Sequence, residues 1–177
     1  IYKPHFAGAL NNLGGLCQKT QDLKQAQAYY EDALKLRQKL SDQNPEAYKP
    51  YVAGTLNNLG CLLSEAKDLK EAQSYYTDAF NLYKDLSDQN PEAYNPSMAM
   101  TLNNLILLSL GLEKKEEAEK AYQEAHDIYQ DLASRYPRAY EINYAKLLVM
   151  GFALLSKPKE DLEKAKAILG KYSEHPK

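Results

Sequence analysis

Histidine, cysteine and carboxylate side chains are the groups of this chain that could carry catalysis or hold a metal, but they form no recognisable site. The three histidines, His5, His126 and His175, lie at unrelated positions. Cys17 and Cys61 lack a CxxC spacing, and no histidine stands near them at metal-ligand spacing. The sequence therefore predicts no enzyme, no metal site and no cofactor.

Paired asparagines are the polar residues whose spacing does favour a function. They stand at Asn11-Asn12, Asn57-Asn58 and Asn103-Asn104, and each pair follows the previous one after 46 residues. A carboxamide both donates and accepts hydrogen bonds, so it can bind the N–H and C=O of a peptide unit whatever the peptide's side chains are. A short amide can also brace a neighbouring helix backbone. Both interpretations stay open at this point.

The asparagine pairs belong to an internal repeat. Leu10 to Gly14 reads LNNLG, Leu56 to Gly60 reads the same, and Leu102 to Ile106 reads LNNLI. Counted directly, 29 of the 46 positions in residues 2–47 are identical in residues 48–93. A period of this size indicates stacked supersecondary units. We expect a solenoid with repeats at about 2–47, 48–93 and 94–139, and a degenerate copy at 140–177.

Each repeat contains two amphipathic helical patterns. In the first copy, Phe6, Leu10, Leu13 and Cys17 recur at helical spacing and predict the core-facing stripe of a helix from about Pro4 to Lys19. A second pattern runs from Leu23 to about Gln43, before Asn44-Pro45. We expect an antiparallel hairpin of a shorter helix A and a longer helix B, closed by a turn at the Asn-Pro-Glu-Ala-Tyr segment.

Small residues recur on the predicted helix B beside large tyrosines and leucines. Neighbouring helices approach within about 8–10 Å only where one side is small. The alanines expected at these close contacts are Ala26, Ala33, Ala72, Ala79, Ala118 and Ala125.

The composition argues against several classes of partner. With 44% hydrophobic and 26% charged residues, the 177-residue chain is typical of globular proteins. Its net charge is only −2, and its basic and acidic residues are interspersed, so we expect neither nucleic acid nor membrane as a partner. No apolar run approaches the roughly 20 residues of a membrane span. The two cysteines are compatible with a reducing compartment, and we expect a cytoplasmic location.

The arrangement L-x-x-L-G on helix A, then alanine, an aromatic residue and alanine on helix B, then a proline-containing turn, resembles the tetratricopeptide repeat (TPR). Units of that family have about 34 residues, fewer than the 46 found here. The LNNL core in lengthened units is most similar to the repeats of kinesin light chains and bacterial multi-TPR proteins. The resemblance covers essentially the whole chain. It implies a single all-α domain over residues 1–177, built as a right-handed α-α superhelix whose concave groove is lined by helix A.

This resemblance implies that the asparagine pairs form the floor of a peptide-binding groove, where their amides should face solvent in the free protein. Met100 and Leu107 should make the downstream end of the groove apolar. The inner face holds few charges, Lys19, Glu65 and Lys157, so an acidic chaperone tail is not the expected ligand. The expected peptide-binding residues are Asn11, Asn12, Asn57, Asn58, Asn103, Asn104, Met100 and Leu107.

We predict a non-catalytic protein interaction module that binds a peptide segment of a partner and forms part of a larger scaffold. One alternative is the peptide-sensing regulatory region of a multidomain signalling ATPase or protease. Another is a structural spacer or a self-association surface. Repeat arrays need polar terminal caps, whereas the first helix presents Phe6 and Leu13 without a preceding hairpin. We therefore expect either another repeat upstream or self-association through this N-terminal edge.

Overall fold

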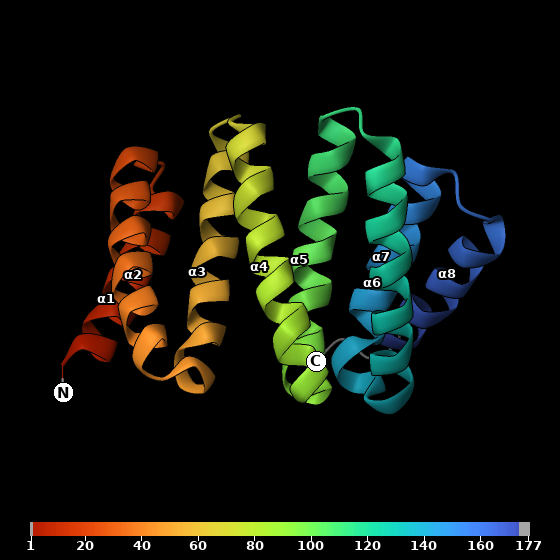
Figure 1. The fold of residues 1–177 in the computed structure, drawn as a ribbon. Helices are drawn as coiled ribbons and strands as arrows, with labels where there is room; N and C mark the ends of the chain where they lie inside the picture. The colour runs from red at the N-terminus through yellow and green to blue at the C-terminus, as the bar shows by residue number, and fades with distance from the viewer. Residues whose placement is uncertain (1, 174–177) are drawn as a thin grey trace. The chain divides into compact units, whose positions relative to one another are not determined.

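The computed structural model describes residues 2–173, and these residues form eight α-helices and no β-strand. The chain divides into two compact units, residues 1–94 and residues 95–177. Consecutive helices within a unit run antiparallel (Figure 1), so the predicted all-α class is confirmed. The helices are α1 (Lys3–Lys19), α2 (Leu23–Gln43), α3 (Pro45–Glu65), α4 (Leu69–Gln89), α5 (Pro91–Gly111), α6 (Lys115–Arg135), α7 (Pro137–Leu155) and α8 (Lys159–Ser173).

Each unit is a row of helical hairpins in which a helix touches both the previous and the next helix. In the first unit, α2 packs against α1 and α3, and α3 packs against α4. In the second unit, α7 packs against α6 and α8. Helix B of one repeat therefore also covers helix A of the following repeat, which is how a solenoid buries its core.

The Asn-Pro-Glu-Ala-Tyr segment starts a helix instead of forming the predicted turn. The Asn44 side chain accepts a hydrogen bond from the backbone N–H of Ala47 at 3.2 Å, and Pro45 is the first residue of α3. An asparagine cap followed by proline is a favourable helix start, because proline has no N–H to leave unsatisfied there. The prediction of a shorter helix A is consequently wrong for α3 and α5, which have 21 residues each, as do α4 and α6.

The small residues of helix B lie where close packing requires them. Each of the six predicted alanines is completely buried, with an exposed fraction of 0%. The prediction that these positions form close helix contacts is confirmed. They are Ala26, Ala33, Ala72, Ala79, Ala118 and Ala125.

The core-facing stripe predicted for the first helix is wrong in part. Phe6 and Leu13 are 58% and 41% exposed, and the buried residues of α1 are Ala7, Leu10 and Gly14. The corresponding residues of α3, Val52 and Leu59, are buried because α2 packs over that helix. Within the first unit, no helix covers the same face of α1.

Enlarging Ala72 should destabilise the fold. The side chain lies in the contact between α3 and α4, so Ala72→Leu should lower the free energy of unfolding by roughly 1–3 kcal/mol through overpacking. The matched control is Lys70→Leu on the exposed face of the same helix, which should stay within about ±0.5 kcal/mol. Urea unfolding followed by circular dichroism measures both variants. Equal shifts would show that packing at Ala72 does not limit stability.

Candidate functional site

Asn11, the first member of the first asparagine pair, is the centre of a hydrogen-bond network between helices. Its Oδ1 accepts from Arg37 Nη1 of α2 at 3.1 Å and from Thr55 Oγ1 of α3 at 3.4 Å. It also accepts from Nδ2 of Asn58, in the next asparagine pair, at 3.3 Å. The Asn11 amide therefore braces α1 against α2 and α3 through side chains. Asn12, its neighbour on α1, is exposed.

Arg37 connects this network to the backbone of the next repeat. Its Nη1 also donates to the carbonyl oxygen of Tyr51 at 3.1 Å and to Thr55 Oγ1 at 2.5 Å. The guanidinium lies over the Tyr51 ring, 5.5 Å from its centroid. Burial lowers the pKa of Arg37, although the guanidinium stays charged at any physiological pH. Arg37 was not among the residues predicted from sequence.

Asn57 does not face solvent as predicted. It is only 6% exposed, and its Nδ2 lies 4.0 Å from Cys61 Sγ. Asn58 is half-buried through its contact with Asn11. Asn57 is therefore part of the packed interior, whereas Asn58 links α3 to α1 of the preceding repeat.

The third asparagine pair differs, since it leaves a polar atom without a partner. Asn103 Nδ2 donates to the Tyr129 hydroxyl of α6 at 3.3 Å, but Asn103 Oδ1 is buried without a hydrogen-bond partner. Asn104 is half-buried. Met100 and Leu107 on the same helix are 51% and 53% exposed. An unsatisfied amide oxygen beside exposed apolar side chains is a feature that a bound ligand could complete.

Each unit contains a cavity between successive A helices. The first, of about 360 Å³, lies between α1, α2 and α3, and the second, of about 410 Å³, lies between α5, α6 and α7. Residues of the first include Pro4, Gly8, Arg37, Tyr48 and Tyr51. The second includes Pro96, Met100, Tyr129, Tyr140 and Asn143, together with Asn103.

The two cavities occupy the same position in the repeat. Each of the five residues named for the first cavity lies 92 residues, twice the 46-residue period, before its counterpart in the second. At the helix B position of this site, Arg37 of the first unit is replaced by Tyr129 of the second. Burial raises the pKa of Tyr129, so its phenol remains a hydrogen-bond donor near neutral pH. The same repeat position thus carries a guanidinium in the first unit and a phenol in the second.

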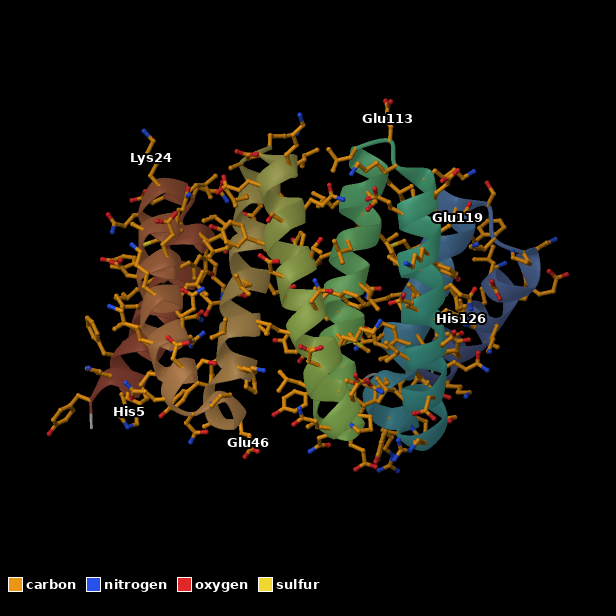
Figure 2. The ribbon with its side chains drawn as sticks, viewed as in Figure 1. His5, Lys24, Glu46, Glu113, Glu119 and His126 are labelled. Carbon is orange, nitrogen blue, oxygen red and sulfur yellow. The ribbon has the colours of Figure 1, made fainter. Side chains whose placement is uncertain are left out.

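The histidines are the remaining candidates for chemistry. His5 lies on α1 and is exposed, and His126 lies on α6 (Figure 2). The His126 Nε2 lies 3.0 Å from the hydroxyl oxygen of Tyr144. His175 lies outside the described residues. Among residues 2–173, no three histidine, cysteine, aspartate or glutamate side chains come together as a metal site. Within the same range, no helix combines the length and apolarity needed to cross a membrane.

Comparison with known proteins agrees with this architecture. Residues 5–85 match the tetratricopeptide repeat. This match covers the first repeats and agrees with the resemblance noted in the sequence. Comparison with curated protein sequences gave no significant match.

A solved structure shows the fold of this chain. The chain is similar to a crystal structure of BtubC (BKLC) from P. vanneervenii, with a TM-score of 0.77 and 22% identity over 97% of this chain. It spans 66% of the BtubC chain. The pilF structure of Pseudomonas aeruginosa matches with a TM-score of 0.39 and 18% identity, over 95% of this chain and 90% of that one. Only the BtubC likeness supports the fold.

Arg37 lies on α2, a helix B, whereas all the site residues predicted from sequence lie on A helices. Alignment of the repeats contains a signal, since Arg37 corresponds to Tyr83 and Tyr129 in the following repeats. Tyr83 and Tyr129 are both below 10% exposed. An arginine at the equivalent position of the first repeat therefore indicates a charge placed inside that repeat. Its long side chain then reaches helix A of its own repeat and of the next repeat.

The bracing role of Asn11 can be separated from that of its neighbour. Asn11→Ala removes the acceptor shared by Arg37, Thr55 and Asn58, and it should lower the free energy of unfolding by about 1–3 kcal/mol. Asn12→Ala is the control, because that side chain is exposed, and it should stay within about ±0.5 kcal/mol. Chemical unfolding of the two variants measures the difference. Indistinguishable unfolding midpoints would mean that the Asn11 network contributes nothing to stability.

Proposed function

We propose that this chain is a non-catalytic protein interaction module that binds a peptide segment of a partner protein along the face formed by its A helices. The observation that carries the proposal is the cavity between successive A helices, which recurs at equivalent positions of the two units. A cavity at the same repeat position in each unit suits the same kind of ligand in both. TPR proteins in general mediate protein–protein interaction, which agrees with this proposal.

The proposed contacts divide the predicted residues into two roles. Met100 and Leu107 supply exposed apolar surface, and Asn103 lines the cavity together with Met100 and Tyr129. We propose that Asn12 and Asn104 contribute further contacts from the same face. In this proposal Asn11, Asn57 and Asn58 act mainly by holding the helices in position, since their amides are half-buried or buried.

The biological setting that we propose is a scaffold in the cytoplasm, in which this chain recruits other proteins. The arrangement of Met100, Asn103 and Tyr129 argues for ligand binding over a purely structural spacer. The unsatisfied buried oxygen of Asn103 lowers the free energy of unfolding by roughly 1–3 kcal/mol, and a purely structural spacer would gain nothing in return. A ligand N–H would recover part of this cost on binding.

Peptide binding at the second unit can be tested directly. A library of defined random peptides would be selected on the full chain, and the enriched peptides would be titrated by calorimetry. Met100→Lys should weaken their binding about tenfold or more, because it puts a charge in place of an apolar contact.

The control for this experiment is Gln123→Lys, at an exposed position of α6 outside the cavity. This variant should bind the selected peptides as the parent chain does. Failure to enrich any peptide, or equal affinity of the Met100 variant and the parent, would contradict the proposal.

A second proposed function is self-association through the exposed face of α1. Tyr2, Phe6, Leu13 and Leu16 are large apolar residues on this face with exposed fractions from 41% to 83%. Three of their counterparts in the next repeat, Val52, Leu59 and Leu62, are at most 6% exposed under α2. In the second repeat, α2 covers the equivalent face of α3. A helix from a second copy of the chain could cover α1 in the same way.

Self-association should appear as a concentration-dependent mass in sedimentation experiments. The double variant Phe6→Lys with Leu16→Lys should remain monomeric at concentrations where the parent chain associates, because lysine introduces charge repulsion and removes apolar area. Gln38→Lys on the exposed side of α2 is the control, and it should associate like the parent chain. A parent chain that stays monomeric at millimolar concentration would exclude this interface.

A further inference from the structure

Arg37 uses only one edge of its guanidinium within the protein. All of its hydrogen bonds are made by Nη1, to Asn11, Tyr51 and Thr55. Neither Nε nor Nη2 has an acceptor among the described residues. A guanidinium has five N–H donors, so the three on Nε and Nη2 remain available. Because Nη1 and the Tyr51 ring hold the group in place, the unused edge is also fixed.

The charge of Arg37 is not balanced by an acid. Its three partners are a side-chain amide, a hydroxyl and a backbone carbonyl, all of them neutral. None of the ion pairs among the described residues involves Arg37. The side chain is half-buried, and removing a cation from water is costly unless an anion compensates it.

The cavity beside Arg37 has the size and lining to admit such an anion. It measures about 360 Å³, and its polar and aromatic walls come from His5, Tyr48 and Tyr51. Apolar walls come from Pro4, Ala7 and Leu40. No acidic side chain lines it, so nothing in the cavity itself would repel a carboxylate.

We infer that Arg37 is an anchor for a carboxylate of the bound peptide, held in the cavity between α1, α2 and α3. This inference rests on the proposed peptide binding and adds the ligand's charge at one position. The Nε–H and one Nη2–H are parallel and match the two oxygens of a carboxylate, which is the strong bidentate arrangement. Lysine would offer a point charge without this fork.

Of the two cavities, only the one in the first unit contains this arginine. The second cavity has Tyr129 at the equivalent position and Asn103 with a free oxygen, which is an acceptor and suits a neutral N–H. The first cavity therefore suits an acidic group, whereas the second suits an uncharged, partly apolar stretch. The expectation that an acidic chaperone tail is not the ligand rests on the charges of helix A, whereas Arg37 lies on helix B.

The carboxylate could belong to an acidic side chain or to the end of the peptide, and three synthetic probes distinguish these sources. The first is acetyl-Ala-Leu-Glu-Leu-Ala-amide, which carries a side-chain carboxylate. The second is acetyl-Ala-Leu-Gln-Leu-Ala with a free terminal carboxylate. The third is acetyl-Ala-Leu-Gln-Leu-Ala-amide, which carries neither. Each is titrated into the ¹⁵N-labelled full chain while the Nε–H resonance of Arg37 is followed by NMR.

The expected result is a saturable shift of the Arg37 Nε–H resonance with one or both acidic probes, and binding about tenfold weaker for the neutral probe. The acidic probe that binds more tightly identifies the source of the carboxylate. Equal binding of all three probes would overturn the carboxylate anchor and leave the proposed peptide binding intact. Absence of binding by all three would also overturn the anchor, whereas the selection experiment on the second unit decides the proposed function separately.

Two variants complete the test. Arg37→Tyr introduces the residue that the repeat already uses at positions 83 and 129, so the fold should tolerate it. It should remove the preference for acidic probes. Arg37→Lys keeps the charge and should retain only part of that preference, because it lacks the planar fork. An acidic preference that survives in Arg37→Tyr would show that another group binds the carboxylate.

Discussion

The contact between a tyrosine of helix B and a glycine of helix A is the interaction on which each hairpin of the first unit depends. A Cβ atom at Gly14 would lie 2.7 Å from the Tyr30 ring, and one at Gly60 would lie 2.6 Å from the Tyr76 ring. Both distances are below van der Waals contact, so only glycine allows the ring to lie flat against the helix. The rings in turn are almost completely buried. This contact sets how closely helices A and B approach.

Close approach of the helices has a polar consequence. Helix A brings its asparagine stripe within hydrogen-bonding distance of side chains from helix B and from the next helix A. Amides in such a position must find partners, because an unpaired buried polar group is costly. Asn11 finds them in Asn58, Thr55 and Arg37. Arg37 also lines the cavity of the first unit, so the network that holds these helices together fixes one group of the cavity wall.

The repeat, its helices and its buried alanines could be predicted from sequence, because periodicity and side-chain size report directly on helix packing. The start of α3 at Pro45 was also encoded, but proline was interpreted as a helix terminator and not as a first residue. Burial of Asn57 and the reach of Arg37 could not be predicted. Both depend on how far neighbouring helices approach, and helical spacing within one segment contains no information about that distance.

Divergence between repeats places different side chains at equivalent positions of this scaffold. The backbone position of residue 37 is kept in later repeats, where tyrosines stand in its place and are buried. A tyrosine at this site ends in a neutral hydroxyl, whereas arginine adds a charge and extra donors without altering the surrounding helices. A single substitution at a position fixed by close packing therefore changes the polar group that lines one cavity, while the equivalent residue of the other repeat keeps its own chemistry. Glycine and alanine preserve the geometry of the repeat, whereas the longer helix B side chains determine the chemistry of the cavity wall, so the two properties can change at different residues.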